Sequence, residues 1–368
     1  MLTYIIAASI NEIENLKPLK NHTEEELKVI VIDEGDKKVR LRNDEHLKDI
    51  PHEHFGPKER EKWFRERFGS AYRRYVSLIP EKCHAETSFG FLHAYEEEAE
   101  MVLEIDDDVY ISENFVEEHI ENLSTTNGVT VHAEGRWYNT LENLVLNVDL
   151  PEYPRGHPYD RETRRNAYSW SVDGSECALN MGLWLNCPDF DALTIAHYGG
   201  LNGKCDIESK ACKREKVIVG EGTYFALCSM NAVFKTQIVP AFYQLYMNTL
   251  GIDRFDDIWS GIFLKRIMDH LGDKACLGKP LGTHSKRSRN VFKDLSKELQ
   301  GMAINEKLWR IVDETEFSSK SYAGCYLELA EYLNRSVERE FDDPIHRKFM
   351  KLQIEKMRTW VDAVDKLS

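Results

Sequence analysis

The chain has 368 residues, 42% of them hydrophobic, and a formal net charge of −15. The length allows one large domain with an extension, or two domains, and the hydrophobic share is ordinary for a protein with a sizeable core. The charge argues against nucleic acid as a partner, because binding a phosphate backbone needs a concentrated basic face.

Membrane insertion and secretion have no support in the sequence. No apolar run approaches the roughly 18–20 residues that span a bilayer, and the N-terminus shows neither a basic region nor a small-residue cleavage site, so we expect a cytoplasmic protein. The eight cysteines form no CxxC pair, which argues against a zinc ribbon. We expect reduced, mostly buried thiols; the alternative is a disulfide between Cys205 and Cys212, which flank a polar loop.

Strand and helix patterns alternate in the first third of the chain. Short apolar, β-branched runs predict buried strands over residues 2–8, 28–33 and 101–105. Between the second and third strands, aromatic residues at helical spacing predict a helix over 58–78, and a shorter helix is expected over 87–98. This alternation predicts an α/β fold with a mostly parallel sheet.

The rest of the chain divides into a loop-rich middle and a helical end. Residues 131–173 predict long loops with short strands, and residues 197–222 predict a mobile polar insertion on the surface. After residue 290 we expect helices over 295–312 and 322–333. A third helix should begin at Asp343 and Pro344, with Asp343 as N-cap and Pro344 in the first position, and run to the end of the chain.

Three adjacent aspartates, Asp106, Asp107 and Asp108, follow the third strand directly. Carboxylates at the end of a strand commonly hold Mg²⁺ or Mn²⁺, hard cations that leave coordination sites open for phosphate oxygens. Asp106 and Asp108 would then face the metal while Asp107 turns elsewhere. The alternative is an exposed acidic turn, which is common in a chain with 63 acidic residues.

Two later groups have the chemistry to complete such a site. Asp256 and Asp257 precede a helical pattern, so they serve either the helix N-terminus or a sugar, as hydroxyl ligands or a base. His284 is a structural histidine or a third metal ligand. The basic cluster beside it, with Lys286 at its start and Arg287 and Arg289 following, supplies the local positive charge that a diphosphate requires.

Several segments together resemble one family, the plant reversibly glycosylated polypeptides, also called UDP-arabinopyranose mutases. The matching stretches, in the family's order, are IDDD at 105–108, RGHPY at 155–159, GLWLNCPDFDA at 182–192, GTYF at 222–225, RFDDIWSG at 254–261, DHLG at 269–272, HSK at 284–286 and CYLEL at 325–329. The GLWLN and RFDD stretches are the most specific. Departures lie near the presumed sugar site: Val109 stands where the family usually has Cys, and about ten extra residues before Gly182 leave Arg161, Arg164 and Arg165 as candidates for the family's second arginine.

The resemblance implies a glycosyltransferase-A-like fold, with a nucleotide-sugar-binding catalytic domain over 1–289 and a helical extension over 290–368. It implies a nucleotide-sugar mutase that interconverts pyranose and furanose forms of a UDP-arabinose-like substrate with Mn²⁺ or Mg²⁺, and that also glycosylates itself, with Arg155 as the matching arginine. The alternatives are a metal-dependent glycosyltransferase acting on an acceptor or on itself, and a non-catalytic scaffold. A homo-oligomer built through the C-terminal helices is a further expectation.

These readings assign roles to ten residues. The metal ligands would be Asp106, Asp108 and His284; the nucleotide would contact Glu34, Asp36, Asp107 and Lys286; and Arg155, Asp256 and Asp257 would act on the sugar. Glu34 and Asp36 follow the second strand and would accept hydrogen bonds from the base or ribose.

Overall fold

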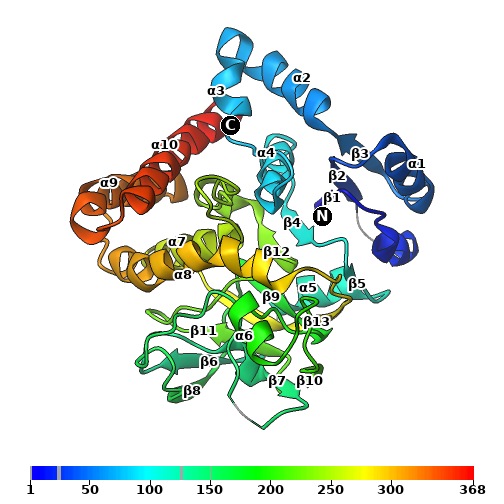
Figure 1. Ribbon diagram of the computed structural model, residues 1–368. Helices are drawn as coiled ribbons and strands as arrows, with labels where there is room; N and C mark the ends of the chain where they lie inside the picture. Colours follow the sequence, from blue (N-terminus) through cyan, green and yellow to red (C-terminus); the bar gives the residue numbers. More distant parts are fainter. Residues whose placement is uncertain (1, 23–25, 125–126, 150) are drawn as a thin grey trace.

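The computed structural model describes residues 2–22, 26–124, 127–149 and 151–368 and shows an α/β fold built on one large sheet (Figure 1). The strand order is β3-β2-β1-β4-β12-β9-β13-β11-β6-β8, with β5, β7 and β10 paired beside this path. The first four strands in this order are mutually parallel and are β3 (His52–Phe55), β2 (Leu27–Asp33), β1 (Thr3–Ser9) and β4 (Met101–Ile105). The three strands predicted in this region are confirmed.

The second half of the sheet is mixed. β12 (Asn231–Lys235) pairs antiparallel with both β4 and β9 (Leu179–Asn186), and β13 (Ala275–His284) runs parallel to β9. The remaining strands are β5 (Val109–Tyr110), β6 (Gly128–Ala133), β7 (Leu144–Leu146), β8 (Tyr168–Asp173), β10 (Ser209–Cys212) and β11 (Lys216–Val219). The α/β class and the glycosyltransferase-A-like arrangement implied by the resemblance agree with this architecture.

The polar segment 197–222 is not simply a surface insertion. Its end forms β11, whose four residues are all buried between β13 and β6. That part of the prediction was wrong, because a strand of four residues is too short to stand out from the Gly- and Lys-rich sequence around it. All eight cysteines are free thiols, and Cys205 and Cys212 are not joined.

The helices before the C-terminal region are α1 (Lys37–His46), α2 (Pro57–Phe68), α3 (Tyr72–Val76), α4 (Ser88–Glu96), α5 (Phe115–Ser124), α6 (Ala192–His197) and α7 (Asp256–Leu271). The 3₁₀ segments are η1 (Glu14–Asn21), η2 (Gly69–Ala71), η3 (His84–Thr87), η4 (Thr140–Asn143) and η5 (Thr236–Ala241). The single helix predicted over 58–78 is divided at Gly69, whose φ of +53° is a conformation that glycine tolerates and a helix does not.

The chain ends in three long helices, α8 (Val291–Asp313), α9 (Tyr322–Glu340) and α10 (Pro344–Leu367). Asp343 caps α10 by accepting from the Ile345 amide, as its sequence predicts. The predicted boundary between 289 and 290 falls just before α8, and the helices share one hydrophobic core with the sheet. Figure 1 shows α10 reaching back to α3 and α4, where the C-terminus lies.

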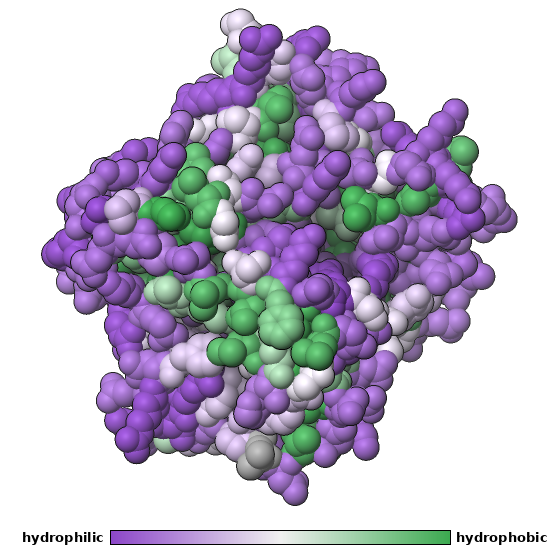
Figure 2. Space-filling model, viewed as in Figure 1, coloured by the Kyte–Doolittle hydropathy of each residue, from purple (hydrophilic) through white to green (hydrophobic). Residues whose placement is uncertain are grey.

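The surface in this view is mainly hydrophilic, with apolar side chains gathered near α6 and the start of α8 (Figure 2). The exposed apolar residues of these segments include Leu193, Leu201, Phe292 and Leu299. Among the residues that the structure describes, no helix has both the length and the apolar character that crossing a bilayer requires.

The contribution of α10 to the stability of the core can be measured at Trp360. Its side chain is fully buried and stacks on the ring of Tyr243, with 5.0 Å between the ring centroids. Its Nε1 donates a hydrogen bond to the Val239 carbonyl at 3.0 Å. Trp360→Ala should lower the free energy of unfolding by about 3–5 kcal/mol, because it leaves a cavity and removes the hydrogen bond to the Val239 carbonyl. Urea denaturation measures this. The control is Ile345→Ala, on the exposed side of the same helix, where a comparable loss would contradict the expectation.

Candidate active site

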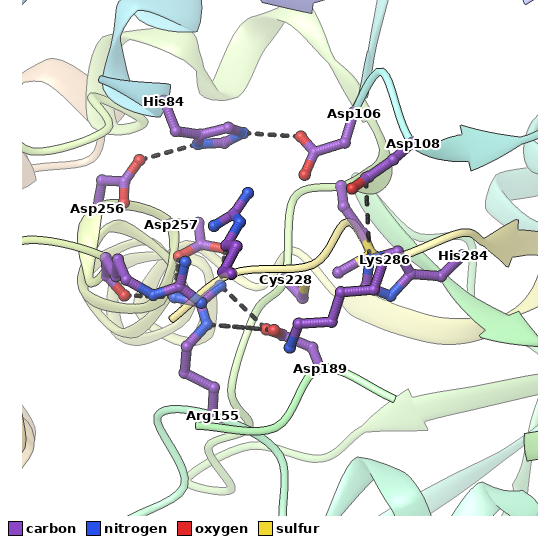
Figure 3. A pocket seen from close by; sticks show the side chains of 13 residues that line it. His84, Asp106, Asp108, Arg155, Asp189, Cys228, Asp256, Asp257, His284 and Lys286 are labelled. Carbon is purple, nitrogen blue, oxygen red and sulfur yellow. Dashed lines mark hydrogen bonds and ion pairs between the residues drawn. The ribbon is translucent and has the colours of Figure 1, made fainter. Parts of the chain in front are cut away.

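A polar cleft lies where the ends of several strands and loops converge (Figure 3). It contains about 650 Å³ of empty space, part of which is open to solvent. Its lining residues are His84, Asp106, Asp108, Arg155, Asp189, Cys228, Met230, Arg254, Asp256, Asp257, His284, Lys286 and Arg289. Seven of the ten predicted residues are therefore brought together in one place.

His284 meets the aspartate triplet through the strand pairing. β13 pairs with β5 so that His284 lies opposite Val109, the residue after Asp108. The result is a distance of 3.8 Å between His284 Nε2 and Asp108 Oδ1. His284 Nδ1 lies 2.7 Å from the Cys187 carbonyl oxygen, so we place the ring proton on Nδ1 and the lone pair on Nε2. Ligating histidines in metal sites are held by their second nitrogen in this way.

Asp106 contacts His84, whereas Asp108 lies near His284. His84, from η3, lies between two carboxylates, with Nε2 3.1 Å from Asp106 Oδ1 and Nδ1 2.8 Å from Asp256 Oδ2. Burial alone would lower the pKa of His84, but the two carboxylates raise it well above the usual value. Burial would raise the pKa of Asp106, and His84 outweighs this and lowers it. His84 could not be predicted from the sequence, because it follows neither a strand nor a recognisable motif.

The donor set of Asp108 and His284 fits a divalent cation, with Asp106 alongside. Burial and the neighbouring Asp106 raise the pKa of Asp108, so a cation at this point would relieve repulsion between the two carboxylates. Within the described ranges, however, Asp106, Asp108 and His284 do not present three donor atoms within 4.8 Å of one another. Mg²⁺ and Mn²⁺ sites in such clefts need only one or two carboxylates when phosphate oxygens and waters supply the rest.

Asp107 is turned away from the cleft toward the N-terminal strand. It accepts hydrogen bonds from the Ser9 hydroxyl and from Asn11 Nδ2, and it pairs with Arg287. Asp107 thus links the triplet to the end of β1 and neutralises Arg287 of the basic cluster.

Arg155 lies at the base of the cleft between two carboxylates. Its Nε donates to Asp189 at 3.0 Å, its Nη2 donates to Asp257 at 3.2 Å, and its Nη1 donates to the Arg254 carbonyl. Burial would lower the pKa of the guanidinium, but Asp189 and Asp257 raise it well above its usual range. Although burial acts in the opposite direction, Arg155 and Lys286 hold the pKa of Asp189 at about 2. Asp189 lies in the GLWLN stretch that carries the resemblance but received no role from the sequence.

Lys286 presents a cation to the cleft without a fixed partner. Its side chain is 9% exposed, and within the described part of the chain Nζ is buried and makes no hydrogen bond. Figure 3 shows it extending toward Asp189. Arg254 and Arg289 line the same space. An ammonium group buried without a hydrogen bond is costly, and an anionic ligand in the cleft would satisfy it.

Asp256 and Asp257 occupy the first turn of α7, which confirms the helix N-terminus interpretation, and their role toward a sugar stays a prediction. They lie at the positive end of the helix dipole, and they also face the cleft. Burial raises the pKa of Asp257, with Arg155 acting in the opposite direction.

The other predicted residues lie outside this cleft. Glu34 is buried, pairs with Arg60 and accepts from the Lys82 amide, and Asp36 caps α1 by accepting from the amides of Lys38 and Val39. The three candidates for a second arginine are also elsewhere: Arg164 lies over the rings of Tyr153 and Tyr159, Arg165 pairs with Glu162, and Arg161 does not line the cleft.

The chain belongs to the reversibly glycosylated polypeptide family, whose model matches residues 75–368. The match includes every residue of the cleft and leaves the first 74 residues, with β1, β2 and β3, outside it.

Its relatives include several plant mutases. UDP-arabinopyranose mutase 3 of Arabidopsis thaliana is 30% identical over 308 residues, which cover 80% of this chain and 75% of the relative. UDP-arabinopyranose mutase 1 of Arabidopsis thaliana is 28% identical over 311 residues, which cover 80% of this chain and 76% of the relative. UDP-arabinopyranose mutase 1 of Oryza sativa subsp. japonica is 29% identical over 307 residues, which cover 80% of this chain and 74% of the relative. This protein is therefore a member of a mutase family.

Removing the charge of Arg155 should destabilise the fold in a pH-dependent way. Arg155→Gln leaves two buried carboxylates without their cation, a loss of about 3–5 kcal/mol at pH 7. Because the folded pKa of Asp189 is lowered to about 2, its favourable contribution is present above the unfolded value near 4 and is lost as the pH falls from about 4 to 2. The difference in unfolding free energy between wild type and variant should therefore be full at pH 7 and shrink below pH 4.

Chemical denaturation of both proteins at pH 7, 4 and 3 measures this difference. The control is Arg164→Gln, which changes an arginine outside the cleft. It should lower the free energy of unfolding at pH 7 by less than Arg155→Gln does. A loss for Arg155→Gln that is the same at pH 3 and pH 7 would show that the ion pairs with the carboxylates are not its cause.

Proposed function

We propose that this protein interconverts the pyranose and furanose forms of a UDP-linked sugar of the arabinose type. The observation that carries the proposal is the buried Lys286 ammonium group, which has no hydrogen-bond partner among the described residues and lies in a cleft with Asp108, His284 and Arg155. Such a cleft suits a diphosphate at one end and a polyhydroxylated sugar at the other. The names of the plant relatives support the choice of substrate.

In this proposal the cations of the cleft hold the diphosphate. Lys286 and Arg289 bind phosphate oxygens, in charge-assisted hydrogen bonds that a low-dielectric cleft strengthens. Asp108 and His284, with Asp106 beside them, would hold Mn²⁺ or Mg²⁺, which offsets negative charge on the diphosphate as it leaves. This arrangement reconciles an anionic substrate with a net charge of −15, because the positive charge is local.

Two bonds to the anomeric carbon change in the reaction: the bond to the phosphate oxygen breaks and later re-forms, and the bond to the old ring oxygen is replaced by a bond to the hydroxyl oxygen that closes the new ring. The bond between that carbon and the phosphate oxygen breaks, and UDP leaves with the electron pair. The sugar then exchanges its ring oxygen: the hydroxyl that closes the new ring loses a proton, and the former ring oxygen gains one. A phosphate oxygen then attacks the anomeric carbon again. Asp257 is the candidate to accept and return the proton, since burial raises the pKa of its carboxyl toward that of a useful base. The atoms and charge balance, as an isomerisation requires.

Arg155 acts through its charge in this proposal. Its guanidinium donates to Asp189 and Asp257, and its pKa is raised well above the usual range, so it stays protonated and is a poor nucleophile. It holds the two carboxylates in place and offsets their charge near the sugar. Self-glycosylation then follows as a side reaction, when an activated sugar meets a protein side chain instead of the diphosphate.

Incubation of the purified protein with UDP-arabinopyranose and MnCl₂ tests the function. The expected product is UDP-arabinofuranose at equilibrium, identified by chromatography and NMR. Lys286→Met should weaken UDP binding by about tenfold or more, because it removes a charged partner of the diphosphate, while Lys293→Met, an exposed lysine of α8, should not. Release of free arabinose, or transfer to an added acceptor as the main outcome, would instead favour a hydrolase or a glycosyltransferase.

The metal assignment has its own test. Asp108→Asn and His284→Gln should each remove the Mn²⁺ dependence of UDP binding in calorimetry, because each removes a ligand. His270→Gln, a histidine of α7 that bonds the Ser319 carbonyl away from the cleft, is the matched control. Circular dichroism checks that the variants are folded. Mn²⁺-enhanced binding that survives in both ligand variants would contradict the assignment.

A further inference from the structure

A second group of metal-ligand side chains lies at the N-terminal edge of the sheet. The edge strand β3 carries His52 and His54 two residues apart and therefore on the same face. Asp44 approaches them from the last turn of α1, which lies beside β3 (Figure 1). One ligand atom from each of the three residues lies within 4.8 Å of the other two, and no other set of three or more His, Cys, Asp or Glu in the described ranges does this.

The two distances from Asp44 to the histidines are compatible with a tetrahedral metal site. Asp44 Oδ1 is 3.1 Å from His54 Nε2 and 3.5 Å from His52 Nε2. Zinc ligands at about 2.0–2.1 Å from the ion, with a tetrahedral angle between them, are about 3.3–3.4 Å apart. The two measured distances lie on either side of this value, so an ion fits with small side-chain movements.

The second nitrogen of each ring is already held. His52 Nδ1 lies 2.8 Å from the Ile50 carbonyl oxygen, and His54 Nδ1 lies 3.2 Å from Oδ2 of the buried Asp33. Each contact places a proton on Nδ1 and leaves a lone pair on Nε2, the ring nitrogen that lies near Asp44. A backbone carbonyl and a carboxylate in these positions are the usual outer partners of metal-ligating histidines.

A simple histidine–carboxylate ion pair accounts less well for this geometry. His54 Nε2 is buried and makes no hydrogen bond to any described residue, although Asp44 Oδ1 is only 3.1 Å away, so the contact is not aligned as a protonated ring nitrogen would require. The Asp44 carboxylate also lies in the last turn of α1, where the helix dipole disfavours negative charge. A cation between the three groups satisfies the nitrogen and offsets this charge.

We propose that Asp44, His52 and His54 bind a zinc ion, with water in the fourth position. Two imidazoles and one carboxylate are a ligand set that suits zinc, whereas Mg²⁺ prefers oxygen ligands alone. The ion would join α1 to the edge strand β3 and so protect an edge that has no further strand beside it. All three ligands precede residue 75, where the family match begins, so this site is a feature of this chain outside the family's shared region.

Zinc titration of the full-length, EDTA-stripped protein tests the proposal. All measurements are made in the Asp108→Asn background, so that the cleft does not contribute, with ZnCl₂ as the probe in calorimetry and in competition with a chromogenic indicator. We expect one zinc per chain, and a loss of affinity of at least tenfold in His52→Gln and in Asp44→Asn. Zinc at about 100 times its Kd should raise Tm by about 3 °C in the parent and not in these variants.

His46→Gln is the matched control, since His46 lies on α1 two residues after Asp44 and pairs with Glu12 instead. It should bind zinc like the parent. His52 and Asp44 are the positions to change because both are partly exposed, and circular dichroism confirms their folding. Cobalt in place of zinc should give the strong visible bands of a tetrahedral ion in the parent and in His46→Gln, and not in His52→Gln or Asp44→Asn. Absence of zinc binding, or equal binding in His52→Gln and His46→Gln, would overturn the proposal.

Discussion

The cleft depends on one buried ion-pair network. Arg155 comes from the loop between β7 and β8, Asp189 from the segment after β9, and Asp257 from the first turn of α7. Because two buried carboxylates cannot remain charged without their cation, these three segments are fixed relative to one another. Their fixed positions orient the rest: Asp256 faces His84, and Lys286 extends toward Asp189.

The two halves of the sheet contribute opposite ends of this cleft. The parallel half of the sheet ends at β4, and the aspartate triplet follows this strand. The mixed half contributes His284 and Lys286, which lie at the end of β13 and just after it. The short pairing of β13 with β5 brings His284 opposite Val109 and within 3.8 Å of Asp108. Asp107 fastens the same turn to β1 through Ser9. A few backbone pairings thus assemble groups that are more than 170 residues apart in the chain.

Charge is distributed unevenly in this protein. The chain as a whole is strongly acidic, yet the cleft has four basic side chains, Arg155, Arg254, Lys286 and Arg289, among its aspartates. Arg155 and Arg254 are committed to internal partners, the latter to Glu298 of α8. Lys286 has no hydrogen bond within the described residues, and this difference separates the groups that build the site from the group that is available to a ligand.

The sequence by itself determined the α/β class, the first strands, the C-terminal helices and the cap at Asp343, because these depend on local apolar patterns and local hydrogen bonds. It also singled out the aspartate triplet, since three carboxylates after a buried strand need a reason to be there. Only the tertiary structure decided what holds Asp107, that His84 bridges Asp106 and Asp256, and that Glu34 pairs with Arg60. Likewise, β11 and the Asp44, His52 and His54 cluster have no sequence signal. Each of these features depends on contacts between distant segments, whose distances and directions neither spacing nor composition can specify.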